Sequence, residues 1–231
     1  MTRRSVQAVL FDFGNTLFAH EPLAATIREV ASSLGTTVTT NWAQSLARRI
    51  EVAAHTEAEL ARHRDLDSGV WSSRWHELYA MADVELPGLG RVIYQAMHEP
   101  ASWVPFAKSA QTLRDLGASG VRIGVVSNTG WDIRSVFRLY GIDKLIDAFV
   151  LSYEVGFTKP APAIFLAACT KLGSDPAATM MVGDDAVSDG GAIHAGLRTL
   201  LLQVPAPGGD NGIGSVNGLV TGLPFRSPRR R

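Results

Sequence analysis

The sequence predicts an α/β fold, in which a doubly wound parallel sheet forms the core and a helical domain is inserted into it. Short apolar runs rich in Val, Ile and Leu are typical of strands buried on both faces of a sheet, and helix-length amphipathic stretches separate the later runs. Strands that alternate with helices in this way imply right-handed crossovers and parallel pairing. The expected strands cover 6–11, 121–126, 148–152, 178–182 and 199–204, and the expected helices lie near 131–140, 160–172 and 187–195.

Residues 19–105 break this rhythm, because they contain no buried-strand runs and show helical spacing instead. We interpret them as a helical cap inserted into a core made of 1–18 and 106–231. One expected apolar face carries Leu46, Ile50, Ala53 and Leu60, and another carries Trp71, Trp75 and Leu78. We interpret the tryptophans as packing residues rather than as a ligand site, since helical spacing is what core burial requires.

Smaller signals define the ends of elements. Pro160 suits the first turn of its helix, and Gly141 and Gly173 suit helix ends. From Pro205 the chain is rich in Gly and Pro and ends in SPRRR, which predicts irregular structure and a loose tail. The glycines of NGIGSVNG do not fit the spacing of a dinucleotide loop, and no helical pattern follows them.

The composition excludes some classes of partner. Lys and Arg together number 22, as do Asp and Glu, so no overall charge attracts nucleic acid or an anionic membrane. No apolar run approaches the roughly 18 residues of a membrane span, and the start of the chain does not resemble a signal peptide. Cys169 is the single cysteine, so no disulfide forms within the chain. We therefore expect a cytoplasmic protein with neither a nucleic-acid nor a membrane partner.

Polar side chains follow the expected strands, at the edge where an open α/β sheet binds its ligand. They are Asp12, Gly14, Asn15 and Thr16 after the first strand, Ser127 and Asn128 after the second, Lys159 before a helix, and Asp184, Asp185 and Asp189 after the fourth strand. Each alone could be a helix cap, a turn residue or a solvated charge. Their joint placement after successive strands favours an active site.

The chemistry of this set can be stated from the residue types. Several carboxylates in one crevice repel one another, and a hard cation such as Mg²⁺ relieves that repulsion. Lys159 and Ser127 suit the oxygens of a transferring phosphoryl group. An aspartate such as Asp12 can act as the nucleophile and form an acyl phosphate that water hydrolyses.

Four motifs carry a family resemblance. VLFDFGNTL, VVSN, FTKPAPAIF and VGDDAVSDGGAIHAG resemble, in order and spacing, the four motifs of the haloacid dehalogenase superfamily, and they span about 5–18 and 104–202. The position of the insert resembles the helical-cap class. The resemblance implies a five-stranded Rossmann-like core with the nucleophile on the central strand, and a Mg²⁺-dependent phosphatase for a small phosphorylated metabolite.

The resemblance also implies a role for each matching residue. Asp12 would be the nucleophile and a Mg²⁺ ligand, with the Gly14 carbonyl and Asp184 as further ligands. Ser127 and Lys159 would bind the phosphoryl group. Thr16 and Asn128 would orient the loops of the substrate site, and Asp189 would be an outer partner of the metal or of the lysine. Asp185 receives no role, and a solvated or helix-capping acid is its alternative.

One departure from the family pattern matters. Phosphatases of the family usually read DxDGT, where the second aspartate is the general acid and base, whereas this chain has Gly14 and then Asn15. A substitute acid could come from the insert, with His20 the first candidate and His55, His63, His76 and His98 behind it.

Other activities remain as alternatives. Haloacid dehalogenases also lack that aspartate, but they need no metal and usually lose the GDxxxxD acids that this chain retains. Phosphonoacetaldehyde hydrolases need a cap lysine, and 19–105 contain none. A weakly active or inactive relative that serves as a binding or scaffold protein is the third alternative.

Overall fold

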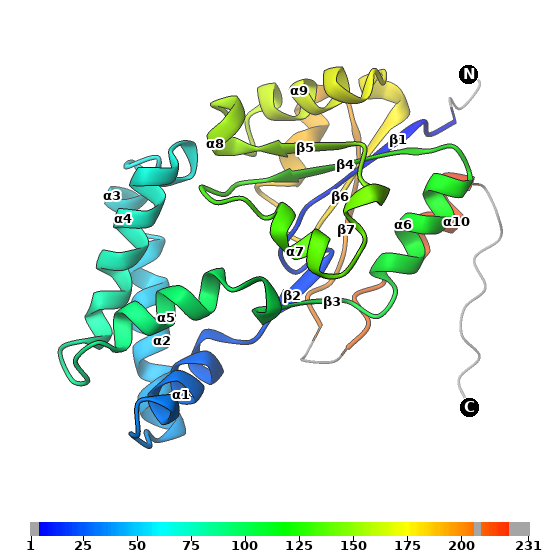
Figure 1. The fold of residues 1–231 in the computed structure, drawn as a ribbon. Coiled ribbons are helices and arrows are strands. Elements are labelled where there is room, and N and C mark those ends of the chain that lie inside the picture. Colours follow the sequence, from blue (N-terminus) through cyan, green and yellow to red (C-terminus); the bar gives the residue numbers. More distant parts are fainter. Residues whose placement is uncertain (1–4, 206–208, 222–231) are drawn as a thin grey trace.

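A five-stranded parallel sheet forms the centre of the molecule (Figure 1). The computed structural model describes residues 5–205 and 209–221. The strand order is β5-β4-β1-β6-β7, so β1 is central, and the predicted doubly wound α/β fold is confirmed. The strands are β1 (Ala8–Phe11), β4 (Arg122–Ser127), β5 (Ala148–Leu151), β6 (Thr179–Gly183) and β7 (Arg198–Leu201).

Helices cover both faces of the sheet, and alternate residues of β1 face opposite sides. Ala8 and Leu10 pack in a buried cluster with α9, whereas Val9 and Phe11 pack in another with α6 and α7. Because both faces are covered, the central strands are mostly apolar, which is why they could be recognised. The core helices are α6 (Ser109–Ala118), α7 (Arg134–Leu139), α8 (Ser152–Val155), α9 (Pro162–Leu172) and α10 (Ser215–Thr221).

The ends of the core helices differ in part from expectation. Gly173 ends α9 at φ 58°, and Gly141 lies just beyond α7 at φ 63°, as predicted. Pro160 does not begin α9; it precedes the helix, and Pro162 takes the first helical position. The helix expected near 187–195 is a 3₁₀ helix over Gly190–Ala195.

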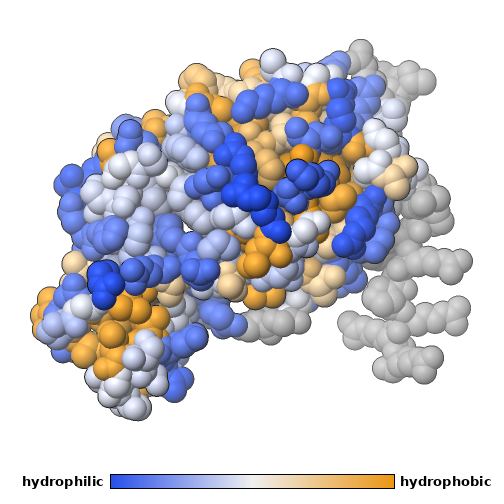
Figure 2. Space-filling view, in the orientation of Figure 1, coloured by the Kyte–Doolittle hydropathy of each residue, from blue (hydrophilic) through white to orange (hydrophobic). Residues whose placement is uncertain are grey.

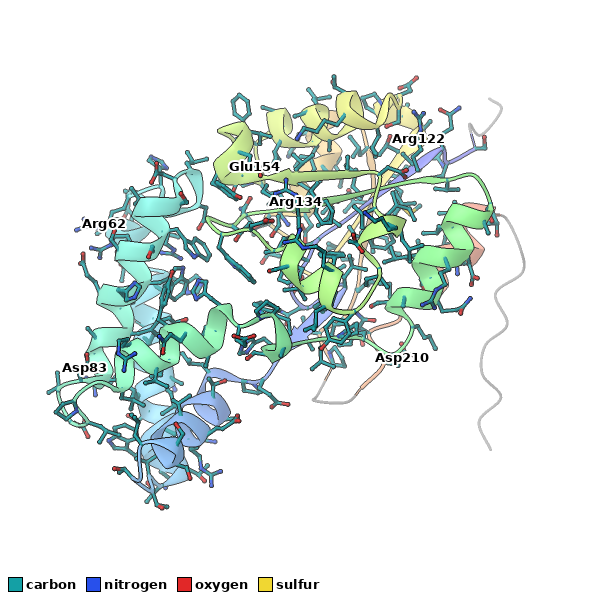
Figure 3. All side chains as sticks on the ribbon, viewed as in Figure 1. Arg62, Asp83, Arg122, Arg134, Glu154 and Asp210 are labelled. Atoms are coloured by element: carbon teal, nitrogen blue, oxygen red, sulfur yellow. The ribbon has the colours of Figure 1, made fainter. Side chains whose placement is uncertain are left out.

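The segment after Pro205 is more regular than predicted. Among its described residues, α10 follows the Gly-rich stretch, and Ile213 and Val216 are fully buried against the core. Lys108 forms an ion pair of 2.5 Å with Asp210, which is labelled in Figure 3. The prediction of irregular structure was therefore wrong for Ser215–Thr221 and holds for 209–214. The expected loose tail falls on 222–231, outside the described residues.

The helical insert folds around a hydrophobic cluster of its own, beside the sheet (Figure 1). Ile27, Ile50 and Leu89 are fully buried in this cluster. Leu60 was expected on the apolar face but is 53% exposed, because α2 ends before it and a separate helix begins. The insert helices are α1 (Leu23–Ser33), α2 (Thr40–Ala54), α3 (Glu57–Leu60), α4 (Ser68–Tyr79) and α5 (Leu89–His98), with 3₁₀ turns at Arg64–Leu66, Ala80–Ala82 and Pro100–Ser102.

Two short strands that the sequence did not reveal connect the insert to the core. β2 (Phe18–His20) pairs antiparallel with β3 (Trp103–Pro105), so the chain enters and leaves the insert along one ribbon (Figure 1). Each strand has three residues, which is too short for an alternation of polar and apolar residues to be recognised.

The insert also contacts the core at a second place. Trp71 of α4 packs on the backbone of Gly130, where a Cβ atom would lie only 2.2 Å from the Trp71 Cβ. The buried Ser152 hydroxyl donates to the carbonyl of Asp65 at 2.6 Å. α4 therefore lies against the loop that follows β4.

The outer surface is mostly polar over the core, and apolar residues gather near α1 at the far end of the insert (Figure 2). An ion pair visible in Figure 3 joins Arg134 of α7 to Glu154 of α8, with two nitrogen–oxygen distances of 2.7 and 2.8 Å. Among the described residues, no helix combines the length and the apolar character that crossing a membrane requires.

Candidate active site

Four loops at the carboxyl edge of the sheet bring the expected polar side chains together. Asp12 follows β1 directly, and its N–H donates to the Val182 carbonyl of β6 at 2.9 Å. Ser127 is the last residue of β4, and Asp184 follows β6 directly. These residues and Lys159 line one cavity of about 470 Å³, which lies between the core and the insert.

Lys159 lies at the centre of the charged groups. Its Nζ donates to Oδ1 of Asp12 and to Oδ1 of Asp189, at 2.6 Å each, and the residue is only 5% exposed. Burial alone would lower the pKa of Lys159, but the two carboxylates raise it above its usual range. Burial also raises the pKa of Asp12, to about 6, against the attraction of Lys159. The geometry holds a cation directly beside an aspartate with an accessible carboxylate.

Asp189 bonds both to Lys159 and to the loop that follows β6. It is fully buried, and its Oδ2 accepts from the backbone N–H groups of Asp184 and Asp185 at 3.0 Å each. Gly183 makes room for it, since a Cβ at Gly183 would lie 2.0 Å from Oδ2 of Asp189. Both oxygens of Asp189 therefore have partners within the protein, and the loop after β6 is fixed by them.

Asn128 and Thr16 fix the neighbouring loops. The Asn128 side chain accepts from the Lys159 N–H at 2.7 Å and donates to the Lys159 carbonyl at 2.9 Å. Thr16 is fully buried, and its hydroxyl donates to Oδ1 of Asp184 at 3.2 Å. Asn128 lines the cavity, whereas Thr16 does not.

Three carboxylates could hold a metal ion. Asp12, Asp184 and Asp189 each offer an oxygen, and these oxygens lie within 4.8 Å of one another. Burial and the neighbouring Asp189 raise the pKa of Asp184. A divalent cation would offset this repulsion, and carboxylate oxygens are the ligands that Mg²⁺ prefers.

Asp185 has a structural partner set of its own. Its Oδ1 accepts from the N–H groups of Val187 and Ser188, at 3.0 and 2.5 Å, and these bonds lower the pKa of Asp185. These contacts are those of a capping acid, which was the alternative given for Asp185, although the residue also lines the cavity.

A family model for the haloacid dehalogenase-like hydrolases matches residues 6–196. The chain belongs to this family. It is 31% identical over 212 residues to a ribulose-1,5-bisphosphate 5-phosphatase of Halopiger xanaduensis, covering 85% of this chain and 84% of that one. It is 32% identical over 206 residues to a glyceraldehyde 3-phosphate phosphatase of Methanothermobacter thermautotrophicus, covering 86% of each. The chain is therefore a hydrolase.

Solved structures agree on the fold. A HAD phosphatase from Thermococcus onnurineus superposes with a TM-score of 0.64 at 21% identity, covering 94% of this chain and 99% of that one. A dehalogenase with an intermediate complex gives a TM-score of 0.71 at 19% identity, covering 94% and 97%. At such identities the likeness concerns the fold alone.

The first motif of this haloacid dehalogenase-like hydrolase departs from the family pattern at two positions. Asn15 adopts φ 55°, a left-handed conformation that asparagine tolerates better than most residues. Gly14 does not adopt a positive φ, and a Cβ there would lie 3.6 Å from the Trp103 ring. The glycine at position 14 is therefore not required by the backbone, and a side chain there would face an indole ring.

Three of the five candidate histidines line one of two cavities, and His63 and His76 line neither. His20, the first candidate for the missing acid, lies on β2 and lines a separate cavity of about 590 Å³. His55 and His98 line the site cavity instead. His98 donates through Nδ1 to the Tyr94 carbonyl at 2.8 Å and accepts at Nε2 from Trp71, and burial lowers the pKa of His98.

Four of the five tryptophans in the sequence line the site cavity: Trp71, Trp75, Trp103 and Trp131. Trp71 and Trp75 were interpreted as packing residues, and that interpretation was incomplete, since both also face this cavity. Helical spacing could not separate the two roles. Trp131 was not singled out, although its place just beyond Ser127 and Asn128 was a usable signal.

Proposed function

We propose that this hydrolase is a Mg²⁺-dependent phosphatase that acts on a small phosphorylated metabolite through an aspartyl phosphate on Asp12. One observation carries the proposal: Lys159 lies 2.6 Å from the carboxylate of Asp12, at the point where the loops after β1, β4 and β6 meet. The sequence relatives named as phosphatases support it.

In this mechanism Asp12 attacks the phosphorus atom, and the ester oxygen departs. Lys159 and Ser127 bind the oxygens of the phosphoryl group, so that its charge is offset as it transfers. Asp189 holds Lys159 in place, since the 2.6 Å bond fixes Nζ between the two carboxylates. Water then hydrolyses the aspartyl phosphate and restores Asp12.

The residues fit a metal ion. Asp12 and Asp184 would supply carboxylate oxygens and Gly14 its carbonyl. Asp189 would not bind the ion directly but would hold Lys159 and the loop of Asp184 in place, because both of its oxygens are occupied within the protein. When bound, Mg²⁺ would offset the negative charge of the phosphoryl group and the carboxylates. Thr16 would orient Asp184 rather than contact substrate, because it is fully buried.

The insert would act as a cap that chooses the substrate. It supplies seven of the nineteen residues that line the cavity, including His55, Trp71, Trp75 and His98, whereas the core supplies the phosphoryl-binding groups. Closure of such a cap excludes water from the reacting groups.

The decisive experiment uses acetyl phosphate, because its leaving group needs no protonation and it makes little demand on the cap. We expect hydrolysis that is lost in EDTA, restored by Mg²⁺ and abolished in Asp12→Asn. Asp115→Asn, a substitution on the exposed side of α6, is the matched control and retains activity. Full turnover by Asp12→Asn or in EDTA would contradict the proposal. Release of chloride from 2-chloropropionate without phosphate turnover would favour a dehalogenase, and no turnover of either would favour a binding protein.

A further inference from the structure

The part of the cavity beyond the charged groups is aromatic. Besides the four tryptophans, Phe13 and Tyr79 line it, and Phe13 lies 4.6 Å from Trp103 between ring centroids. Among the lining residues that the structure describes, Lys159 is the one lysine or arginine, and it is already bonded to two carboxylates. A second phosphate group on a substrate would find no cation here.

The tryptophans are held in place by the insert itself. Trp71 donates to His98 at 3.0 Å, and Trp103 donates to the Met97 carbonyl at 3.2 Å. The guanidinium of Arg64 lies 5.0 Å from the ring centroid of Trp75. Rings fixed before binding lose little conformational entropy when a ligand stacks on them.

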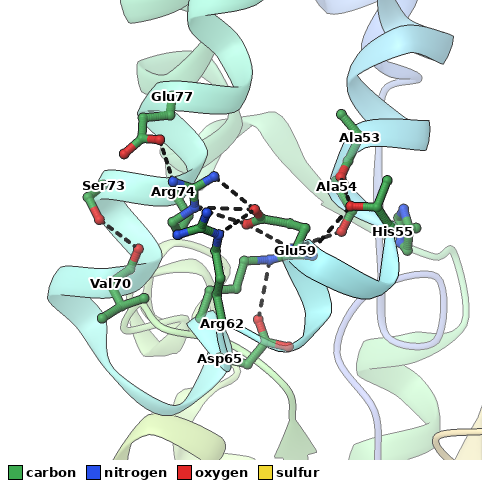
Figure 4. Close-up of polar contacts among 12 residues, drawn as sticks. Ala53, Ala54, His55, Glu59, Arg62, Asp65, Val70, Ser73, Arg74 and Glu77 are labelled. Atoms are coloured by element: carbon green, nitrogen blue, oxygen red, sulfur yellow. Dashed lines mark hydrogen bonds and ion pairs between the residues drawn. The ribbon is translucent and has the colours of Figure 1, made fainter.

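A buried ion cluster around Glu59 fixes Arg64, and Figure 4 labels its members Glu59 and Arg74. Glu59 is 5% exposed and accepts from Arg64 at 3.4 Å and from Arg74 at 2.8 Å. Arg64 also donates to the Ala54 carbonyl at 2.8 Å. The position of the Trp75 ring is therefore set by contacts that do not involve the core.

The cavity side chains best placed to protonate a leaving group are engaged elsewhere. Gly14 carries no side chain, and both nitrogens of His98 are engaged, with Nε2 accepting rather than donating. The Nδ1 of His55 donates to the Glu51 carbonyl, and Oδ1 of Asp185 accepts from the N–H groups of Val187 and Ser188. A phenol-like oxygen, whose conjugate acid has a pKa of about 10, departs far more readily than an alcohol without such help.

We infer that the substrate is a phosphate monoester of an aromatic hydroxyl group, whose ring stacks among the cavity tryptophans while its phosphoryl group meets Asp12. The inference rests on the proposed function. An Asp12 oxygen forms a bond to phosphorus, and the bond between phosphorus and the aryl oxygen breaks with its electron pair on oxygen. Water then cleaves the aspartyl phosphate, so one ester and one water give one phenol and one phosphate.

Two matched comparisons test it on the full chain with Mg²⁺. Benzylphosphonate and cyclohexylmethylphosphonate differ only in the aromatic ring, and as inhibitors of acetyl phosphate hydrolysis we expect Ki to be about tenfold lower for benzylphosphonate. Phenyl and benzyl phosphate differ in the leaving oxygen, and we expect kcat/KM, which reports the step in which that oxygen departs, to be at least about a hundredfold higher for phenyl phosphate. Equal Ki values, or equal kcat/KM values, would overturn the inference while acetyl phosphate turnover still upheld the proposed function. Loss of acetyl phosphate turnover itself would instead refute the proposed function.

Variants locate the ring. Trp75→Leu should raise the Ki of benzylphosphonate about tenfold and the Ki of inorganic phosphate by less than twofold. Trp42→Leu is the control, because Trp42 is the fifth tryptophan and does not line this cavity. Circular dichroism checks the fold, and Trp131→Leu replaces the first variant if Trp75→Leu does not fold. Equal effects of the cavity and control variants would overturn the inference.

Discussion

Gly14→Asp restores a carboxylic acid at the position where phosphatases of the family usually carry their general acid. The structure indicates that the backbone accepts it, because Gly14 lies outside the left-handed region and a Cβ there meets the Trp103 ring at 3.6 and 3.9 Å, which is ordinary contact. We therefore expect a change in the free energy of unfolding of less than about 1 kcal/mol.

The expected effect on rate depends on the leaving group. General acid catalysis is typically worth ~10²–10⁴-fold, and it matters most for an alcohol that leaves poorly. We expect Gly14→Asp to raise kcat/KM for benzyl phosphate by about 10²-fold, which corresponds to about 2.7 kcal/mol of activation free energy for the step in which the ester oxygen departs. For phenyl phosphate we expect less than a tenfold change.

Steady-state kinetics on the two esters measure this ratio. Gly14→Asn is the matched control, since it adds nearly the same volume beside Trp103 but cannot donate a carboxyl proton. Circular dichroism and Mg²⁺ affinity of both variants must match those of the unchanged chain before their kinetics are compared. If the Asp and Asn variants behaved alike, or if both esters gained equally, the reasoning about a missing leaving-group acid would be refuted.

Three further predictions concern stability. Glu59→Gln removes the carboxylate that Arg64 and Arg74 share and leaves only Asp65 and Glu77 beside them, so it should lower the free energy of unfolding by about 2 kcal/mol in urea denaturation; a loss below about 0.5 kcal/mol would show that the cluster is not energetically coupled. Asn211→Ala removes the 2.8 Å bond to the Thr16 carbonyl and should cost about 1–3 kcal/mol by the same assay, whereas an unchanged denaturation midpoint would indicate that water replaces the bond. Arg134 lowers the pKa of Glu154, so their ion pair stabilises the fold above the ordinary glutamate pKa, and this contribution is lost as pH falls through the depressed value. Arg134→Met should therefore flatten the dependence of the free energy of unfolding on pH in that acid range only. Parallel profiles of unfolding free energy against pH for the variant and the unchanged chain would contradict this assignment.

The sequence predicted those parts of the fold whose residue types are set by a single physical cause, such as burial. The central strands β1, β4 and β6 are buried on both faces, so their composition alone identified them, and the carboxyl edge of a parallel sheet then placed Asp12, Ser127 and Asp184 together. The carboxylate partners of Lys159 were expected only from the family resemblance.

Features that depend on docking could not be predicted. Which histidine reaches the cavity is set by how the insert lies on the core, and His98 lies there while His20 lies elsewhere. Pro160 and Pro162 are equally suited to begin a helix, so the sequence could not choose between them. α10 was missed because the glycine-rich stretch before it suggests irregular structure, and the burial of Val216 depends on packing against the core.

The pairing of β2 with β3 means that the insert could be removed or replaced as one continuous segment without changing the topology of the core. Because His20 pairs with Trp103 and Phe18 with Pro105, the two points where the insert joins the core are neighbours across a strand pair. A tight two-residue turn can close such a pair in place of everything between its ends. Insertion, deletion or exchange of the whole segment would leave the order of the five core strands unchanged, so a single continuous replacement in the gene would change the insert and keep the sheet.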